Sequence, residues 1–450
     1  MSDLLRNHAR RIWHAAVESA RPEPLMRRAL TDLAGGLSAA PRILVLGAGK
    51  AGAAMAEAVE RVFSDRLDRI DGVVNVSAEA VKPLRKIRLH AARPAATNFP
   101  TAAGVAGAQE MLRLAKNAGP SDVALCLLSG GGSALLPAPA EGVSLADKLA
   151  VTRLLHHCGA TIDEMNAVRK HLSAIKGGRL AQAFAGAKLY SLIISDVIGD
   201  PLDVIASGPT APDPTTFAQA LNVLDRYHLR EQCPAAVLAH LRCGTDGKIR
   251  ETAKSMPGHV HNLVIGSNVK ALADAQAVAE QLGYRVLNLG SYIEGETRHI
   301  ATMHASIVRS ICEQGVPFTP PACLLSGGET TVTLSANPGK GGRNQEFVLA
   351  ALLKLGATPN VAILSGGSDG EDGPTDAAGA IADASTLERA TGPGLDGRDY
   401  LQRNDAYSFF QATGDLFITG LTQTNVMDVR VLLIGHGPPH LSSPAATAPL

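Results

Sequence analysis

Three apolar segments run directly into the tripeptide Ser-Gly-Gly, and this repeat is the strongest chemical signal in the sequence. The three serines are Ser129, Ser326 and Ser365, and each follows a pair of Leu or Ile residues. A loop with almost no side chains lets backbone N–H groups approach an anion closely, because glycine has no Cβ and tolerates positive φ. A fourth apolar segment ends in Gly47–Gly52, which also contains Lys50. Four such strand ends predict a ligand with several phosphate charges, although any single one of them is also explained as a tight strand–helix turn.

The segment Gly47–Gly52 matches the pattern G-x-G-x-x-G, which is typical of dinucleotide binding when it lies between a strand and a helix. That pattern also requires an acidic residue about 20 positions further on, at the end of the next strand. Here the next strand ends at Ser77 and the first acid after it is Glu79, so the interpretation as an NAD site is weakened. Lys50 would lie at an electropositive helix start, which predicts a phosphate or carboxylate partner for it; an ordinary solvated lysine is the alternative.

The loop Ser129–Ser133 holds three consecutive glycines, Gly130, Gly131 and Gly132, between two hydroxyl donors. Three glycines cost conformational entropy, so we predict an anion-binding loop in preference to a simple turn. The sequence lacks the pattern G-x-x-x-x-G-K-[ST], which excludes a P-loop NTPase by motif.

The stretch Asn166–Arg179 is basic, and on a predicted helix over residues 162–176 its residues Arg169, Ser173 and Lys176 share one face. This face is expected either to line a cleft for an acidic substrate or to be solvated. Asp196 follows another apolar strand and is a candidate base or metal ligand; capping of the next turn is the alternative.

In the second half, Arg343 lies just before a predicted helix, where it could clamp a transferring phosphoryl group; a solvated linker arginine is the alternative. Asn344 is the predicted helix N-cap. The most acidic loop follows the third Ser-Gly-Gly, and its carboxylates suit Mg²⁺ beside a phosphate site unless they form only an exposed turn. Its candidate ligands are Asp369, Asp372 and Asp376.

The chain has 450 residues, which favours two domains. Its 42 basic and 42 acidic residues cancel, so there is no global basic field for nucleic acid. The six cysteines are scattered without a Cys-x-x-Cys pair, which predicts free thiols in a reducing compartment. Neither a secretion signal nor a stretch long enough for a transmembrane helix is found, so a cytoplasmic location is expected.

Strands expected at 43–46, 72–76, 123–128 and 189–195 alternate with helices, which is the signature of an α/β domain with a mostly parallel sheet. The segment 199–215 is rich in Pro, Gly and Asp and is predicted to be a long functional loop. We place the domain boundary in the polar stretch 242–259. The strand predicted at 261–265, the helix after it and the strand at 285–289 would then form a βαβ unit of the second domain.

Taken together, these segments resemble the class II glycerate 2-kinase family with its MOFRL-type C-terminal domain. The segments that carry the resemblance are Gly47–Gly52, Leu127–Ser133, Asn166–Arg179, Ser195–Pro209, Ser326–Thr330, Gly339–Glu346, Ser365–Asp383 and Gly414–Val429. The resemblance implies two α/β domains with the active site in the cleft between them. The first would be Rossmann-like over residues 1–245, and the second a smaller mixed α/β domain over 246–436. Residues 437–450 are predicted to be a disordered tail.

The resemblance further implies ATP-dependent phosphorylation of D-glycerate at its 2-hydroxyl, with Mg²⁺, to give 2-phospho-D-glycerate. It points to Lys50, Arg343, Asp196 and Asp369 as catalytic residues. We expect ATP to contact the glycine loops, and the residues predicted to bind it are Gly47, Gly49, Ser129, Gly130, Gly131, Gly132, Ser133, Ser326, Gly327, Gly328, Glu329 and Asn344. Asp369, Asp372 and Asp376 are the predicted metal ligands. The expected partners are the two small substrates, without nucleic acid or membrane, and the interpretation allows a homodimer.

One segment departs from the family pattern. Where a Gly-His-Pro-x-Pro-Asp-like sequence is expected, this chain reads Ala92–Thr97, with Arg93 before Pro94. This departure bears on substrate identity. The alternative functions are an NAD(P)H-dependent hydroxypyruvate reductase, a name given to some bacterial relatives, and a non-catalytic sensor of sugar phosphates.

Overall fold

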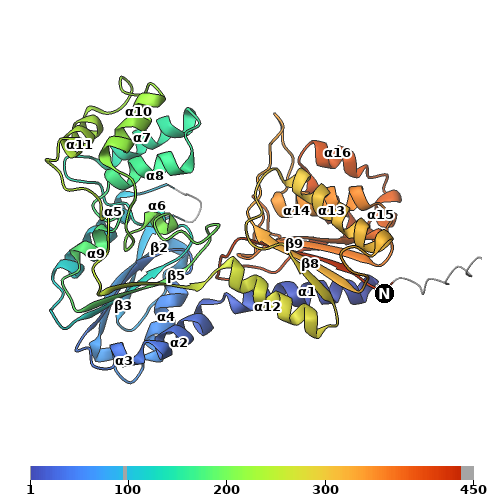
Figure 1. The fold of residues 1–450 in the computed structure, drawn as a ribbon, viewed down its shortest axis with the longest axis horizontal. Helices are drawn as coiled ribbons and strands as arrows, with labels where there is room; N and C mark the ends of the chain where they lie inside the picture. Colours follow the sequence, from blue (N-terminus) through green and yellow to red (C-terminus); the bar gives the residue numbers. More distant parts are fainter. Residues whose placement is uncertain (1, 95–98, 437–450) are drawn as a thin grey trace, which may run out of the picture. The chain divides into compact units, whose positions relative to one another are not determined.

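The computed structural model describes residues 2–94 and 99–436, and the chain packs into two compact units (Figure 1). The parallel-sheet unit consists of Ala20–Ser267 with Gln423–Val426. The mixed-sheet unit contains the other described residues, including the first helix. The tail predicted over 437–450 and the segment 95–97 of the departure lie outside the described residues.

The parallel-sheet unit is built on six parallel strands in the order β3-β2-β1-β4-β5-β6. The central strands β1 and β4 are buried along their whole length, as expected for apolar runs covered on both faces. The strand order reverses between β1 and β4, and α/β sheets bind ligands at the carboxyl ends beside such a reversal. The predicted Rossmann-like sheet is therefore confirmed. The strands are β1 (Ile43–Ala48), β2 (Ile70–Ser77), β3 (Ile87–Arg93), β4 (Val123–Leu128), β5 (Lys188–Ile194) and β6 (Val260–Gly266).

Helices of the parallel-sheet unit fall into two groups. The first group comprises α2 (Pro22–Asp32), α3 (Ala34–Leu37), α4 (Gly52–Val62), α5 (Ala102–Lys116), α6 (Gly132–Leu135) and α9 (Arg179–Ala183), with the 3₁₀ turns η1 (Leu67–Arg69), η2 (Ala78–Ala80) and η3 (Ile205–Ser207). The second group comprises α7 (Leu145–His157), α8 (Ile162–His171), α10 (Phe217–Arg226) and α11 (Ala235–Thr245), which lie together in Figure 1. This second group has its own apolar core, which includes Leu155, Phe217 and Leu241.

Helix α8 ends at His171, five residues before the predicted end at 176. The chain then turns, and Gly177 and Gly178 adopt positive φ values of 59° and 77°. The backbone leaves the helical conformation at Leu172, and Ser173 Oγ then accepts from the N–H groups of Ile175 and Lys176. The prediction that Arg169, Ser173 and Lys176 share a helix face is therefore wrong.

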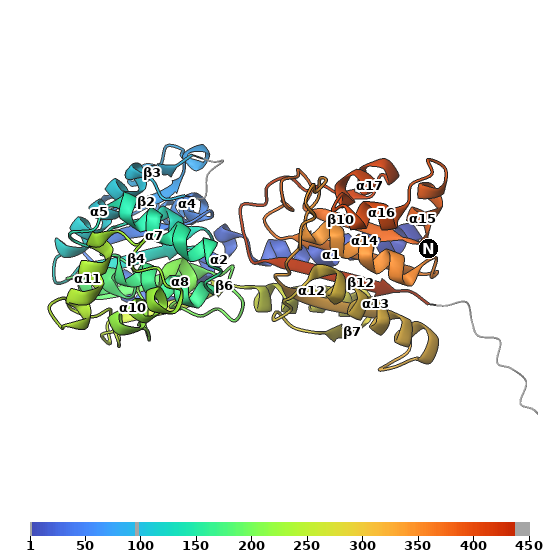
Figure 2. The same cartoon turned by 90° about the horizontal axis from the view of Figure 1, so that it is seen from above.

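The mixed-sheet unit is a three-layer structure around six strands in the order β11-β10-β9-β12-β8-β7. Strand β12 runs antiparallel to both of its neighbours, β8 and β9. Helices α1 and α12 cover one face, and α13 and α14 cover the other (Figures 1 and 2). The strands are β7 (Arg285–Asn288), β8 (Ala322–Gly328), β9 (Val361–Gly367), β10 (Gly379–Asp383), β11 (Leu416–Phe417) and β12 (Asp428–Ile434). The helices are α1 (Ser2–Ser19), α12 (Asn268–Gln281), α13 (Thr297–Gln314), α14 (Arg343–Leu355), α15 (Ala384–Thr391), α16 (Gly397–Gln402) and α17 (Ala406–Thr413).

The predicted βαβ unit over residues 261–289 is wrong. Strand β6 pairs with β5 in the first sheet, whereas β7 pairs with β8 in the second. The Asn262 side chain fixes β6 to the long loop of the same unit, because it donates from Nδ2 to the Thr210 carbonyl at 2.9 Å and accepts from the Thr210 hydroxyl at 2.7 Å. The chain passes between units at Ser267 and Asn268, downstream of the boundary expected near residue 245.

Helix α1 packs in the mixed-sheet unit, although the expected domain ranges put it in the first domain. Trp13 is fully buried, and its indole Nε1 donates to the Gly366 carbonyl at 3.2 Å. A Cβ on Gly366 would lie 2.9 Å from that Nε1. Gly366, the first glycine of the third Ser-Gly-Gly, is therefore required for the packing of α1.

The described residues contain no helix that is long and apolar enough to cross a membrane. All six cysteines are free thiols, as predicted, and Cys126, Cys233 and Cys323 are buried.

Replacing Gly366 by Ala should destabilise the protein, because the new Cβ would collide with the Trp13 indole. We expect the free energy of unfolding to fall by about 1–3 kcal/mol, the usual cost of overpacking. The control is Gly392→Ala, since Gly392 has helical dihedral angles and no atom within 4 Å of its Cβ position. Urea unfolding followed by tryptophan fluorescence measures both; equal effects of the two substitutions would contradict the packing argument.

Candidate functional site

At the carboxyl ends of β1 and β4, two glycine loops touch each other. The backbone N–H of Lys50 donates to the Gly130 carbonyl at 2.8 Å, and that of Ala51 donates to Ser129 Oγ at 3.0 Å. Gly49 adopts a φ of 150°, and a Cβ there would lie 2.0 Å from Ser129 Oγ. Only glycine allows this approach. The structure thus brings the segments Gly47–Gly52 and Ser129–Ser133 together at the reversal of strand order.

The same contacts weaken the interpretation of Gly47–Gly52 as a dinucleotide-binding loop. The N–H groups of Gly49, Lys50 and Ala51 all donate within the protein, Gly49 to the Asn75 carbonyl at 3.4 Å. A Rossmann pyrophosphate would require such groups to face the ligand. Gly47 is explained by packing, because a Cβ there would lie 2.1 Å from the Leu127 carbonyl oxygen. The role of Gly47 and Gly49 in ATP binding stays a prediction.

Two predicted residues, Asp196 and Lys50, lie beside the second loop together with Arg93. The carboxylate of Asp196 lies against Gly130, where a Cβ would come within 2.3 Å of Asp196 Oδ2. A Cβ on Gly131 would lie 3.6 Å from Lys50 Cγ and 3.7 Å from Arg93 Nη2. Arg93, noted in the sequence only as a departure, therefore adds a guanidinium group close to Lys50. Within the described part of the chain, the N–H groups of Gly130 and Gly131 donate no hydrogen bond, so they are available to an anion.

The basic stretch also reaches this loop. Arg169 Nη2 donates to Ser133 Oγ at 2.7 Å, and Lys176 Nζ lies 2.5 Å from the same oxygen. Ser207 Oγ lies 3.0 Å from Ser133 Oγ and 3.3 Å from Lys176 Nζ. Although Arg169 and Lys176 share no helix face, the turn after α8 returns Lys176 to the hydroxyl that Arg169 contacts. We call Ser133, Arg169, Lys176 and Ser207 the serine–cation group.

Lys148 on α7 adds a positive charge near this group. It is partly buried, and its Nζ donates to the Leu172 carbonyl at 2.9 Å. Burial, together with Arg169 and Arg179, lowers the pKa of Lys148 to about 7. Burial and the neighbouring cations likewise lower the pKa of Lys176 well below its usual value.

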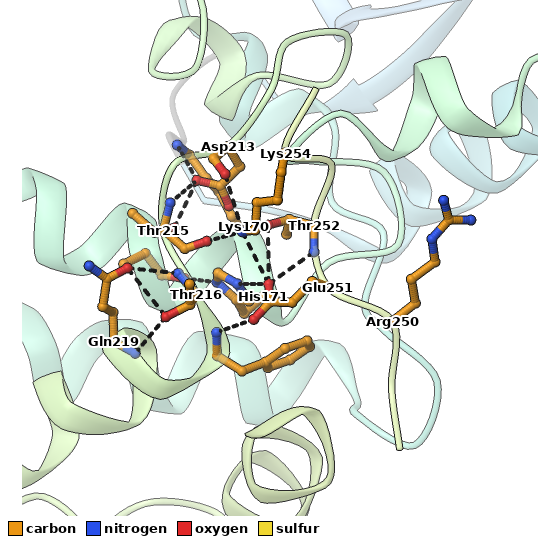
Figure 3. Close-up of polar contacts among 12 residues, drawn as sticks. Lys170, His171, Asp213, Thr215, Thr216, Gln219, Arg250, Glu251, Thr252 and Lys254 are labelled. Carbon is orange, nitrogen blue, oxygen red and sulfur yellow. Dashed lines mark hydrogen bonds and ion pairs between the residues drawn. The ribbon is translucent and has the colours of Figure 1, made fainter. Parts of the chain in front are cut away.

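Lys170, the residue after Arg169, is neutralised instead. Its Nζ lies 2.9 Å from Asp203 Oδ2 and 3.3 Å from Asp213 Oδ1. Figure 3 shows Lys170 beside Asp213, next to the contact between His171 and Glu251. Since Asp203 and Asp213 both belong to the predicted functional loop 199–215, Lys170 anchors that loop to α8.

The lowered pKa of Lys148 predicts how the stability of the folded protein depends on pH. The folded protein binds this proton less tightly than the unfolded chain does, so Lys148 weakens folding increasingly as pH falls from about 10 toward 7. Lys148→Met should therefore raise the melting temperature more at pH 6 than at pH 10. Thermal melts at the two pH values measure the difference, with exposed Lys188→Met as the control; an equal gain at both would contradict the assignment.

In the mixed-sheet unit, Asp428 is the centre of the polar contacts. It begins β12, opposite Gly328 of β8 and Gly367 of β9, and it is fully buried. Its Oδ2 accepts from Arg343 Nε at 2.8 Å and from Arg430 Nη2 at 3.0 Å. Its Oδ1 accepts from Asn344 Nδ2 at 2.9 Å.

Arg343 has a second acidic partner, because its Nη1 lies 2.8 Å from Glu329 Oε1. Burial alone would lower the pKa of Arg343, but Asp428 and Glu329 outweigh it and raise the pKa above its ordinary value. Arg343 is therefore a permanent cation held in place by two carboxylates. Its use as a phosphoryl clamp stays a prediction.

The remaining Ser-Gly-Gly serines are engaged inside the unit. Ser326 Oγ lies 2.8 Å from Nε2 of His304, whose pKa burial lowers to about 4. Ser365 Oγ donates to Asn344 Oδ1 at 2.6 Å. Gly327 is needed because a Cβ there would lie 1.7 Å from Asn268 Oδ1, and one on Gly328 would lie 2.4 Å from the Ile293 carbonyl oxygen. Packing thus accounts for these residues, and the predicted contacts of Ser326, Gly327, Gly328, Glu329 and Asn344 with ATP stay untested.

The acidic loop supplies a helix cap. Asp372 accepts the backbone N–H of Asn344 at 3.0 Å and of Gln345 at 2.8 Å, so it caps α14 in place of the predicted Asn344. Burial raises the pKa of Asp372 to about 7.

Asp376 is exposed and accepts from the Tyr407 hydroxyl at 2.8 Å. No group of three or more His, Cys, Asp or Glu is placed to hold a metal within residues 2–94 and 99–436. The metal roles of Asp369, Asp372 and Asp376 stay predictions.

Several central residues were missed by sequence reasoning. Asp428 stands at the start of an otherwise apolar strand, and a lone acid in that position was the available signal. Ser207 lies in the loop 199–215, which was identified as functional without naming it. Lys148 gave no signal, because it lies in a helix outside the motifs that the sequence analysis singled out.

Asp428→Asn should strongly destabilise the mixed-sheet unit, because it leaves Arg343 and Arg430 without their shared countercharge. Breaking a buried ion pair costs about 3–5 kcal/mol. The control is Asp399→Asn, which breaks an exposed pair with Arg403 and should cost at most about 1 kcal/mol. Chemical denaturation of both variants tests the prediction, and a small effect of Asp428→Asn would remove Asp428 from its central role.

Comparison with known proteins agrees with this organisation. A family model described as a domain of unknown function, DUF4147, matches residues 8–242, and a model of the MOFRL family matches residues 322–428. The chain is 40% identical over 394 residues to the glycerate 2-kinase of Pyrococcus horikoshii, which covers 87% of each sequence. It is 42% identical over 427 residues to an Agrobacterium vitis protein with the provisional name hydroxypyruvate reductase, covering 95% of this chain and 94% of that one.

The fold has also been seen in a crystal structure. The glycerate kinase of Thermotoga maritima superimposes with a TM-score of 0.86 at 35% identity, covering 96% of this chain and 100% of that chain.

Proposed function

The chain belongs to the family that combines the DUF4147 and MOFRL domains, and from this membership we propose that it is a glycerate kinase. The proposed reaction transfers the γ-phosphoryl group of ATP to the 2-hydroxyl of D-glycerate and yields 2-phospho-D-glycerate and ADP. The names of relatives that match nearly the whole chain support the reaction class. The name of the Pyrococcus enzyme supports phosphorylation at the 2-hydroxyl.

One observation in the structure supports phosphoryl transfer most directly. Lys50, Arg93 and two available glycine N–H groups meet beside Asp196 at the carboxyl ends of parallel strands. Phosphoryl transfer needs charge neutralisation and positioning more than covalent chemistry. In the proposal, Lys50 and the glycine N–H groups hold negative charge, and Asp196 accepts the proton of the attacking hydroxyl.

Arg343 and Asp369 complete the proposed catalytic set from the mixed-sheet unit. Arg343 carries its charge at any physiological pH and would stabilise a phosphoryl group. Magnesium bound with ATP would supply further charge neutralisation. Asp372 fits such an ion poorly, because it is buried and accepts the backbone N–H groups of Asn344 and Gln345. Asp369 is the proposed ligand, with Asp376 as a further candidate.

The reductase name of some relatives gives the second candidate function. Hydride transfer from NAD(P)H requires a dinucleotide site, and the N–H groups of the Gly47–Gly52 segment donate within the protein. We therefore rank the kinase first, ahead of the reductase and of a sensor of sugar phosphates.

The decisive experiment incubates the protein with Mg-ATP and D-glycerate and identifies the product by ³¹P NMR. We expect 2-phospho-D-glycerate. Formation of 3-phospho-D-glycerate would support the kinase activity but contradict the proposed phosphorylation of the 2-hydroxyl. Lys50→Met should lower turnover about a hundredfold or more, as expected when charge stabilisation in the transition state is lost. Lys188→Met, at the other end of a parallel strand and exposed, is the control, and circular dichroism checks that both variants fold.

Full turnover in Lys50→Met would refute the role of Lys50. Loss of NADH absorbance with hydroxypyruvate, without any requirement for ATP, would instead support the reductase.

A further inference from the structure

The serine–cation group concentrates positive charge on a single neutral acceptor. Arg169 and Lys176 both contact Ser133 Oγ, at 2.7 and 2.5 Å, and Lys176 also contacts the Ser133 carbonyl at 2.8 Å. Lys176 is only 3% exposed. A serine hydroxyl accepts such donors but cannot neutralise them, so two charges remain without compensation.

Among the described residues, no carboxylate forms an ion pair with Arg169, Lys176 or Lys148. Lys170, next to Arg169 in sequence, pairs with two aspartates. Burying unpaired charge is costly, so proteins usually pair it or use it to bind an ion. The contrast between Lys170 and its neighbours indicates a cluster that a ligand completes.

A strained turn places the second hydroxyl. Ala206 and Ser207 adopt positive φ values of 51° and 60°, which are unfavourable for residues with a Cβ. The turn is held because Gly177 N donates to the Ser207 carbonyl at 3.1 Å and Gly178 N to the Gly208 carbonyl at 2.7 Å. Strain of this kind persists where the surroundings impose it, and such positions cluster at ligand sites. Here it holds Ser207 Oγ toward Ser133 and Lys176.

We propose that Ser133, Arg169, Lys176 and Ser207 bind the phosphate chain of the nucleotide, an assignment that deepens the proposed kinase function and rests on it. The number of charges decides between the two anionic substrates. A carboxylate carries one negative charge and would leave one of the two cations of the group uncompensated. A nucleoside di- or triphosphate carries about three to four, and the guanidinium fork of Arg169 suits phosphate oxygens. The adjacent Gly130 and Gly131 N–H groups extend the same surface.

Isothermal titration calorimetry with ADP, on the full-length protein, tests the assignment without catalysis. We expect Arg169→Gln and Lys176→Met each to raise the Kd for ADP about tenfold or more, the loss expected for a charge-assisted hydrogen bond. The matched control is Arg153→Gln, because Arg153 is exposed on α7. Its Kd should stay within about twofold of the wild type.

A milder variant guards against misfolding. Ser207→Gly removes the hydroxyl and suits the positive φ at that position, so it should fold at least as stably as the wild type. We expect it to weaken ADP binding while the KM for D-glycerate stays nearly constant. Thermal melts verify that each variant is folded.

Normal ADP binding in folded Arg169→Gln, Lys176→Met and Ser207→Gly would overturn the assignment even if the wild type is an active kinase. An increase in the KM for D-glycerate alone would identify the group as a carboxylate site and also overturn it. If the wild type binds ADP and the variants do not, but no phosphoryl transfer occurs, the phosphate site stands and the kinase proposal fails. Absence of ADP binding by the wild type would reject both.

Discussion

Backbone segments that touch at glycine determine where each sheet presents its polar groups. Gly49 lies against Ser129 and Gly130 lies against Asp196, so the loops after β1, β4 and β5 meet at one place. In the other unit, Gly327 lies against Asn268 and Gly366 against Trp13. A Cβ at any of these positions would separate elements that pack in contact. The same glycine-rich pattern therefore joins three loops at one edge of the parallel sheet and packs helices against the mixed sheet.

The two units treat charge in opposite ways. In the parallel-sheet unit, Arg169 and Lys176 converge on hydroxyl groups, with Lys148 near them, and their surroundings depress the pKa values of both lysines. In the mixed-sheet unit, Arg343 and Arg430 share the carboxylate of Asp428. The cations of the parallel-sheet unit favour binding of a polyanion. The Asp428 carboxylate instead holds Arg343 in a defined orientation. Both properties are useful to a phosphoryl-transfer enzyme, which must bind a highly charged substrate and still control where each charge lies.

Sequence patterns predicted the parallel sheet, the second α/β unit and the glycine loops at the strand ends. The resemblance to the family put Lys50 and Asp196 in one catalytic set, and the structure places both beside the Ser129–Ser133 loop. These succeeded because strand ends and glycine loops are local signals, and parallel strands present their carboxyl ends at a common edge. The assignment of β6 to the second sheet failed, because the choice of strand partner is a tertiary property. The helix predicted over 162–176 ends at His171 instead, because the Ser173 hydroxyl accepts backbone N–H groups in the turn that follows, and periodicity does not reveal such a turn. Asp428 and Ser207 depend on contacts between distant segments, which no local pattern contains. The catalytic roles of Arg343 and Asp369 stay predictions.

The mixed-sheet unit is assembled from both ends of the described chain. Its helix α1 comes from residues 2–19, and β12, which separates β8 from β9, comes from residues 428–434. During vectorial synthesis the Trp13 indole leaves the ribosome more than 300 residues before Gly366, its hydrogen-bond partner. The nascent chain must therefore carry an amphipathic helix with an uncovered apolar face while the intervening unit is translated and folds. The mixed-sheet unit is thus expected to complete its fold only after β12 has been synthesised, with the apolar face of α1 uncovered until then.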